Sequence, residues 1–143
     1  MDPITHEGGC HCGSLRWQFE TGQPLAAFSP RACDCDFCTR QCAAWISDPL
    51  GVLRIHSRDA AGPRRYRQGS GQAEFLSCHV CGVLVAVVAG AADGRLLGAA
   101  NRNAFDHRDK LGVAVVASPQ LLAAEAKLAR WSALWMQVEM DAG

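Results

Sequence analysis

Cys33-Asp34-Cys35-Asp36-Phe37-Cys38 is the densest run of cysteines in the chain, and Cys42 follows four residues later. Two further clusters flank this run, namely Cys10-His11-Cys12 and Cys78-His79-Val80-Cys81. Thiols this close together, in a chain without signs of export, favour a metal site over disulfides. We therefore expect the other residues to form the scaffold that brings the three clusters together.

The composition is typical of one globular domain spanning residues 1–143, which is long enough to bury a core. Fourteen basic residues balance fourteen acidic ones, so the chain lacks the basic field on which nucleic-acid binding depends. The beginning of the sequence has neither the basic nor the apolar region of a signal peptide. The longest apolar run, residues 83–92, is shorter than the roughly 20 residues that cross a bilayer.

We therefore expect a cytoplasmic protein without nucleic-acid or membrane partners, and the sequence leaves its oligomeric state open. Thiols stay reduced in the cytoplasm, where zinc explains eight cysteines better than four disulfides do.

Alternation of apolar and polar residues predicts a mainly β fold. Leu15, Trp17 and Phe19 alternate with polar residues in a clear half-buried strand. Related patterns predict strands at residues 5–10, 25–28, 43–47, 52–56, 64–68, 73–77, 83–89, 95–100 and 138–140, with a last core strand at 112–117. Residues 36–41 are expected to form a helical turn.

A helix is expected near the end of the sequence. Ser118-Pro119 is typical of a helix start, and strong helix formers continue to Leu134. Trp131 and Trp135 recur at helical spacing, which favours core packing for this aromatic stripe. The chain is thus predicted to be a mostly antiparallel β protein with one short C-terminal helix.

The spacing of the cysteines suggests two metal sites. Residues two apart in extended backbone share a face, so Cys10 and Cys12 can bind one metal, as can Cys33 and Cys35. Glycine follows both flanking clusters, where it lets backbone amides approach the sulfurs, but no glycine follows the central cluster. This asymmetry favours one closed site, although the sequence separations alone allow other pairings. The closed site would contain Cys10, Cys12, Cys78 and Cys81.

The central cluster then provides Cys33, Cys35 and Cys38. Three protein ligands with an open fourth position are typical of catalytic rather than structural zinc. Cys42 leaves three alternatives open: it is a fourth ligand, a nearby exchange thiol, or a small buried residue. The first alternative would close the site and make both zinc sites structural.

Three stretches together resemble the glutathione-dependent formaldehyde-activating enzyme family, whose zinc domain is shared with centromere protein V. They are Gly9-Cys10-His11-Cys12-Gly13-Ser14-Leu15, the central run from Cys33 to Cys38, and Phe75-Leu76-Ser77-Cys78-His79-Val80-Cys81-Gly82. The resemblance spans roughly residues 5–137 and implies an antiparallel β-tent built around zinc. The sequence departs from the commoner pattern at Asp34, where many members have histidine, and at Cys42, where many have glycine.

The resemblance also implies two zinc ions, one closed at Cys10, Cys12, Cys78 and Cys81 and one labile at Cys33, Cys35 and Cys38. The implied activity is that of a carbon–sulfur lyase, which forms S-hydroxymethylglutathione reversibly from formaldehyde and glutathione. In that picture the second zinc would bind a thiolate or polarise the aldehyde oxygen, which makes its three cysteines the catalytic residues.

A glutathione-type thiol needs polar or cationic partners for its carboxylates. We expect Arg40, beside the central cluster, to be one, with Asn103 and His107 from the polar segment 101–110. The alternative function is a non-catalytic, zinc-stabilised binding module with two structural zinc sites.

Overall fold

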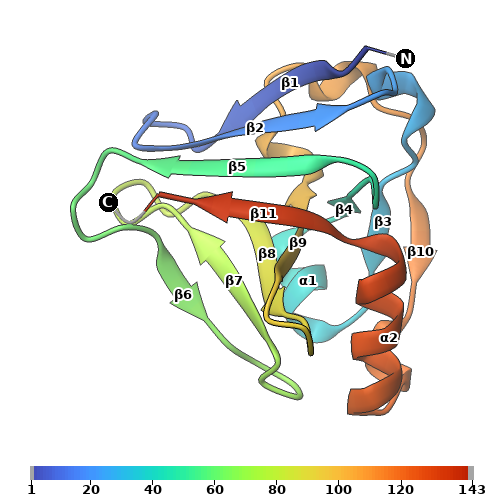
Figure 1. Ribbon diagram of the computed structural model, residues 1–143. Helices are drawn as coiled ribbons and strands as arrows, with labels where there is room; N and C mark the ends of the chain where they lie inside the picture. Colours follow the sequence, from blue (N-terminus) through green and yellow to red (C-terminus); the bar gives the residue numbers. More distant parts are fainter. Residues whose placement is uncertain (1, 142–143) are drawn as a thin grey trace.

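The computed structural model describes residues 2–141, and its architecture is mainly β (Figure 1). The strands are β1 (Ile4–Gly9), β2 (Leu15–Thr21), β3 (Arg31–Cys33), β4 (Trp45–Ile46), β5 (Val52–Ser57), β6 (Arg64–Tyr66), β7 (Ala73–Ser77), β8 (Leu84–Gly90), β9 (Leu96–Asn101), β10 (Val115–Ala117) and β11 (Met136–Met140). The α-helices are α1 (Asp36–Gln41) and α2 (Ala124–Leu134). Four single 3₁₀ turns complete the described elements: η1 (Leu25–Ala27), η2 (Arg102–Ala104), η3 (Arg108–Lys110) and η4 (Pro119–Leu121).

Strand β9 is the branch point of the sheet. It pairs antiparallel with β8 along one edge. Along its other edge it pairs antiparallel with two strands in succession, first with β11 and then, nearer its C-terminal end, with β4. From β11 the sheet continues through β5 and β2 to β1, and from β4 through β3 to β10. Strands β7 and β6 extend it beyond β8. Figure 1 shows β1, β2, β5 and β11 lying across the top while β6–β9 descend steeply below them, which gives the expected tent.

The core fills the angle between these two arms. Leu15, Trp17 and Phe19 of β2 are buried, as their alternation predicts. The Trp17 ring packs edge-on against Phe105 at a centroid distance of 4.7 Å, and its indole N–H donates to the Val85 carbonyl at 3.0 Å. These contacts join β2 to β8 and to the segment after η2. They fix the positions from which the cysteine-bearing turns project.

Two predicted strands differ from the structure. Residues 25–28 form the turn η1 rather than a strand, and within that turn only Leu25 is buried, so no alternating face is present to pair. Strand β10 forms where predicted but lies at an edge of the sheet, paired with β3 alone among the described strands. Val116 in β10 is 77% exposed, so the expectation of a core strand was wrong.

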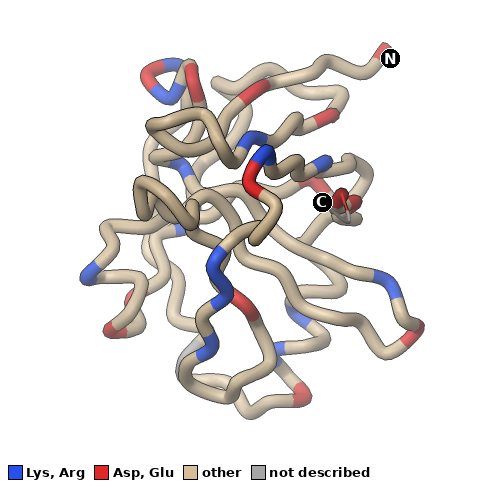
Figure 2. The backbone as a smooth tube through the Cα atoms, turned by 90° about the vertical axis from the view of Figure 1, so that its left-hand side faces the viewer, with Lys and Arg blue, Asp and Glu red and all other residues tan. Residues whose placement is uncertain are grey.

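The C-terminal helix begins later than predicted. Ser118-Pro119 starts η4, and α2 begins at Ala124. The reason is a contact with a distant part of the chain, because the Ser118 hydroxyl donates to the Asp34 carboxylate at 2.6 Å instead of capping a helix. No described helix has the length and apolarity to cross a bilayer. Basic and acidic residues are interspersed along the chain, which agrees with the absence of a basic field (Figure 2).

Candidate metal centres and the adjoining cavity

The first candidate metal centre joins the turn after β1 to the turn after β7. The sulfurs of its four cysteines all lie within 4.8 Å of one another, and these residues are Cys10, Cys12, Cys78 and Cys81. The Sγ atom of Cys12 lies 3.6 Å from the Sγ atoms of both Cys10 and Cys78. A tetrahedral zinc with Zn–S bonds of about 2.3 Å would separate its sulfurs by about 3.8 Å. The four sulfurs therefore fit one tetrahedral metal ion.

Backbone amides surround the sulfurs of this centre. The Leu15 N–H donates to Cys10 Sγ at 3.3 Å, and the N–H groups of Val80 and Cys81 donate to Cys78 Sγ at 3.3 and 3.4 Å. Such bonds stabilise thiolates, the form in which cysteine binds metals. Burial raises the pKa of Cys10 to about 11, so metal binding must displace a proton there.

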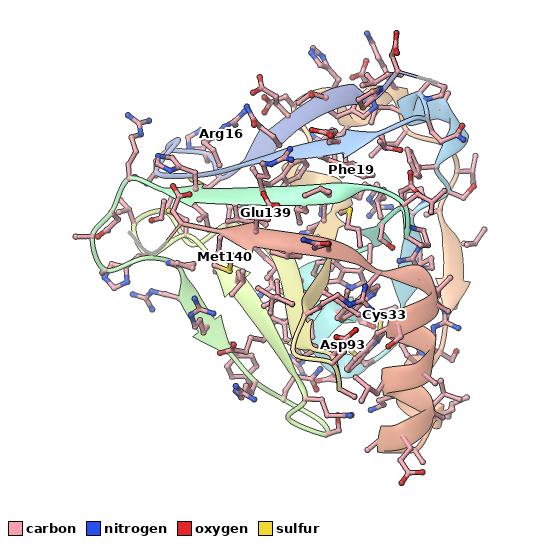
Figure 3. The ribbon with its side chains drawn as sticks, viewed as in Figure 1. Arg16, Phe19, Cys33, Asp93, Glu139 and Met140 are labelled. Atoms are coloured by element: carbon pink, nitrogen blue, oxygen red, sulfur yellow. The ribbon has the colours of Figure 1, made fainter. Side chains whose placement is uncertain are left out.

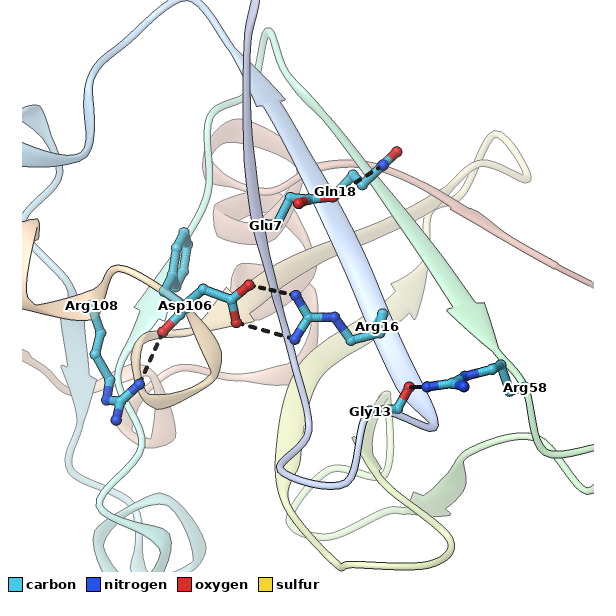
Figure 4. Close-up of polar contacts among 8 residues, drawn as sticks. Glu7, Gly13, Arg16, Gln18, Arg58, Asp106 and Arg108 are labelled. Carbon is cyan, nitrogen blue, oxygen red and sulfur yellow. Dashed lines mark hydrogen bonds and ion pairs between the residues drawn. The ribbon is translucent and has the colours of Figure 1, made fainter.

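The turns that carry these cysteines depend on glycine and on arginine contacts. Gly13 and Gly82 have φ angles of +86° and +81°, a region that favours glycine. The Arg58 guanidinium donates to the Gly13 carbonyl at 3.0 Å (Figure 4). Figure 4 also shows Arg16 of β2 forming a forked pair with Asp106, which ties the neighbouring segment to the sheet. The first centre is thus held rigidly from several sides.

The second candidate metal centre contains Cys33, Cys35 and Cys38, whose sulfurs also lie within 4.8 Å of one another. Cys33 ends β3, and Cys35 caps α1 by accepting the Cys38 N–H at 3.4 Å. Among the described residues no other cysteine, histidine or carboxylate joins this group. A hydrogen bond from Cys38 lowers the pKa of Cys33 to about 6, and the same pairing raises the pKa of Cys38.

Cys42 lies outside both groups. It is exposed and ends α1 in the left-handed region, with φ 53° and ψ 35°. Two of its three alternatives, the fourth ligand and the small buried residue, are therefore wrong, and the exchange thiol stays a prediction. A left-handed residue directly after a helix is the position where glycine is preferred. Glycine would therefore adopt this backbone conformation with less strain than the cysteine does.

A cavity of about 370 Å³ adjoins the second centre. All three of its cysteines line the cavity, and residues of α2 together with Trp135, which follows that helix, also line it. Figure 3 shows Cys33 beside α2. The rings of Trp131 and Trp135 stack at 4.6 Å and both contribute to this wall. The prediction of core packing is confirmed for this stripe, because Trp135 is buried in a hydrophobic cluster and Trp131 is partly buried against the same cluster.

Three cationic side chains line the same cavity: Arg31, Lys127 and Arg130. Burial and the positive charge of Arg130 lower the pKa of Arg31 to about 10. The Arg31 guanidinium donates to the Ser47 hydroxyl at 2.7 Å, and that hydroxyl donates to the Leu134 carbonyl. These three cations were not among the residues predicted to bind the thiol. Their spacing in the sequence could have indicated a shared site. Arg31 precedes Cys33 by two residues in a strand, and Lys127 precedes Trp131 by four residues in a helix, so each pair shares a face.

The residues predicted to bind the thiol lie elsewhere. Arg40 is exposed and pairs with Asp36 at 2.9 Å. The Asn103 amide donates to the Cys42 carbonyl at 3.0 Å, so it supports the end of α1. His107 is exposed and precedes η3. Arg40, Asn103 and His107 are not among the residues that line the cavity, and their role in thiol binding stays a prediction.

One solved structure similar to this chain is the crystal structure of a Rhodobacter sphaeroides protein from structural genomics. The two sequences are 25% identical, the TM-score is 0.58, and the alignment covers 78% of this chain and 99% of that one. The likeness supports the fold. No family model and no curated protein matches this chain, so the family resemblance seen in its motifs stays a prediction.

Proposed function

We propose that this protein is a zinc-dependent carbon–sulfur lyase that adds a thiol of the glutathione type reversibly to formaldehyde or a related small aldehyde. One observation carries the proposal. The sulfurs of Cys33, Cys35 and Cys38 converge without a fourth ligand among the described residues, and they face a cavity large enough for a small molecule. Three protein ligands beside an accessible cavity are the arrangement of catalytic zinc sites. The motif resemblance to the formaldehyde-activating family supports the same activity.

Zinc is the metal that we infer for both centres. Thiolate ligands in tetrahedral arrangement favour zinc, and a four-cysteine set is typical of structural zinc. The first centre would then be the closed site that stabilises the fold, and the second the labile one. A cytoplasmic location would keep all eight cysteines reduced.

The proposed reaction needs no oxidant or reductant. The thiol sulfur forms a bond to the carbonyl carbon, the carbon–oxygen π bond breaks, and the thiol proton ends on the carbonyl oxygen. When bound, zinc with an open position would supply a Lewis acid that stabilises negative charge on the thiolate or on that oxygen. The three cysteines would hold the metal at the cavity wall. The stacked rings of Trp131 and Trp135 provide an apolar part of the wall, and the cationic side chains would orient an anionic substrate.

Exchange NMR on mixtures of formaldehyde and glutathione tests this function. We expect the zinc-loaded protein to accelerate interconversion of the free thiol and its hydroxymethyl adduct, and Cys38→Ser to abolish the acceleration. Cys42→Ser is the matched replacement outside the group, and a loss of rate there would identify Cys42 as an exchange thiol. A wild-type rate no faster than the protein-free reaction would remove the lyase assignment.

The second candidate function is the non-catalytic module with two structural zinc sites. One observation favours it. The sulfur of Cys35 accepts a hydrogen bond from the N–H three residues later, and the sulfur of Cys78 in the closed site does the same, so the two centres share this local geometry. Metal release separates the two functions. The enzyme should keep one zinc and lose the other readily to a chelator or to millimolar glutathione. If both ions resist equally, and Cys35→Ser lowers stability without changing thiol binding, the module is the correct function.

A further inference from the structure

The cations of the cavity differ from most other arginines of the chain in having no acidic partner. Six arginines form salt bridges to carboxylates at 4.0 Å or less: Arg16, Arg40, Arg54, Arg65, Arg67 and Arg95. Within the described part of the chain, no such bridge reaches Arg31, Lys127 or Arg130. These three are partly buried. Partly buried cations without a counterion are costly, because they lose hydration and gain no partner.

The other charges around the cavity do not balance these cations. Asp36 is the carboxylate among the described lining residues, and its charge is already paired with Arg40. Three thiolates with one divalent zinc carry a net charge of −1, which offsets one cation. A positive excess therefore remains beside the second centre. The side chains of Arg31 and Cys33 leave the same face of β3, about 7 Å apart along the strand.

We propose that Arg31 and Arg130 form a carboxylate-binding subsite, so that the thiol taken by this cavity is an acid whose carboxylate lies at these guanidinium groups. The thiol part of this inference rests on the proposed function, whereas the carboxylate part rests on the cavity alone. The guanidinium fork matches a carboxylate with two parallel hydrogen bonds, and the aromatic wall lowers the local dielectric and strengthens the pairing. The strand spacing favours a few bonds between sulfur and carboxylate. Lys127 adds attraction on the same helix as Arg130.

Calorimetric titration of the zinc-loaded protein tests the subsite with three probes. The probes are 3-mercaptopropionate, the neutral thiol 2-mercaptoethanol, and propionate, which has the acid without the thiol. We expect 3-mercaptopropionate to bind at least tenfold more tightly than 2-mercaptoethanol. Propionate should shift the indole N–H signals of Trp131 and Trp135 in NMR spectra.

Arg130→Gln carries the mutational test, because Arg31 also holds Ser47 and its replacement disturbs the fold. We expect Arg130→Gln to reduce the preference for the acidic thiol about tenfold and Arg130→Lys to keep part of it. Arg95→Gln is the matched control, since Arg95 pairs with Asp93 and does not line the cavity.

Equal binding of the acidic and neutral thiols would overturn the subsite, as would an unchanged preference in Arg130→Gln. Loss of the preference in Arg40→Gln alone would assign the carboxylate to Arg40 and would also overturn it. These outcomes are distinct from failure of the lyase function. If the protein prefers the acidic thiol but does not accelerate exchange, the subsite stands and the lyase function is removed. If it accelerates exchange but shows no preference for the acidic thiol, the lyase function stands and the subsite is removed.

Discussion

Replacing Cys42 with glycine separates the role of its thiol from the strain of its backbone. A non-glycine residue in the left-handed region costs about 1–2 kcal/mol, and Cys42 has φ 53° there. Glycine relieves that strain but makes the unfolded chain more flexible, which costs about 0.5–1 kcal/mol. The thiol is exposed, so its removal leaves no buried cavity. Cys42→Gly should therefore raise the free energy of unfolding by about 0.5–1 kcal/mol, or roughly 2–4 °C in Tm.

Thermal unfolding at fixed protein and zinc concentrations measures this change, and native mass spectrometry counts the bound zinc. The matched control is Cys42→Ala, which removes the thiol but keeps the strained β-carbon, so its Tm should equal that of the wild type. Both variants should retain two zinc ions. The reasoning is refuted if Cys42→Gly binds one ion fewer, which would make Cys42 a ligand, or if its Tm falls.

Three further predictions concern the metal centres and the branch of the sheet. Cys81→Ser should prevent cooperative folding, because structural zinc contributes folding energy directly; a soluble variant that melts cooperatively would contradict the closed site. After removal of metal from the second centre alone, iodoacetamide at pH 7 should label Cys33 before Cys38 by peptide mapping, since the lowered pKa of Cys33, about 6, keeps it ionised. The labelling rate of Cys33 should fall below pH 6, and prior labelling of Cys38 would contradict the assignment. Gly98→Ala should lower the free energy of unfolding in urea by about 3 kcal/mol, because its β-carbon would lie 2.4 Å from the Val87 carbonyl oxygen; unchanged stability would show that β8 can shift.

Local patterns in the sequence predicted the features that depend on neighbouring residues. Alternation at Leu15, Trp17 and Phe19 identified β2, because one face of that strand is buried and the other is not. The glycine after each flanking cluster indicated that these two clusters form one site, because both turns require a positive φ, at Gly13 and at Gly82. Each of these signals lies within a few residues of the structure that it specifies.

The cavity could not be predicted in the same way, because its walls come from distant segments. Arg31 and Arg130 meet across about a hundred positions of sequence, and no local pattern indicates that α2 covers the second centre. The choice of Arg40 rested on adjacency in sequence, whereas its helix turns it towards Asp36. The helix start was misplaced because Ser118 bonds to Asp34, a partner from another part of the chain.

The two ends of α2 are attached unequally, which has a consequence for local opening. Its C-terminal end continues into β11, which is paired on both edges by β5 and β9, while its first residue is held by a hydrogen bond from the Gln72 amide to the Ala124 carbonyl. The end of α2 at Trp135 is buried, whereas its first turn is exposed, so the first turn should open more readily. Amide hydrogen exchange should be slowest beside Met136 and fastest in the first turn of α2. Molecules would then enter past Lys127, while Arg130, nearer the buried end, would keep its place on the cavity wall.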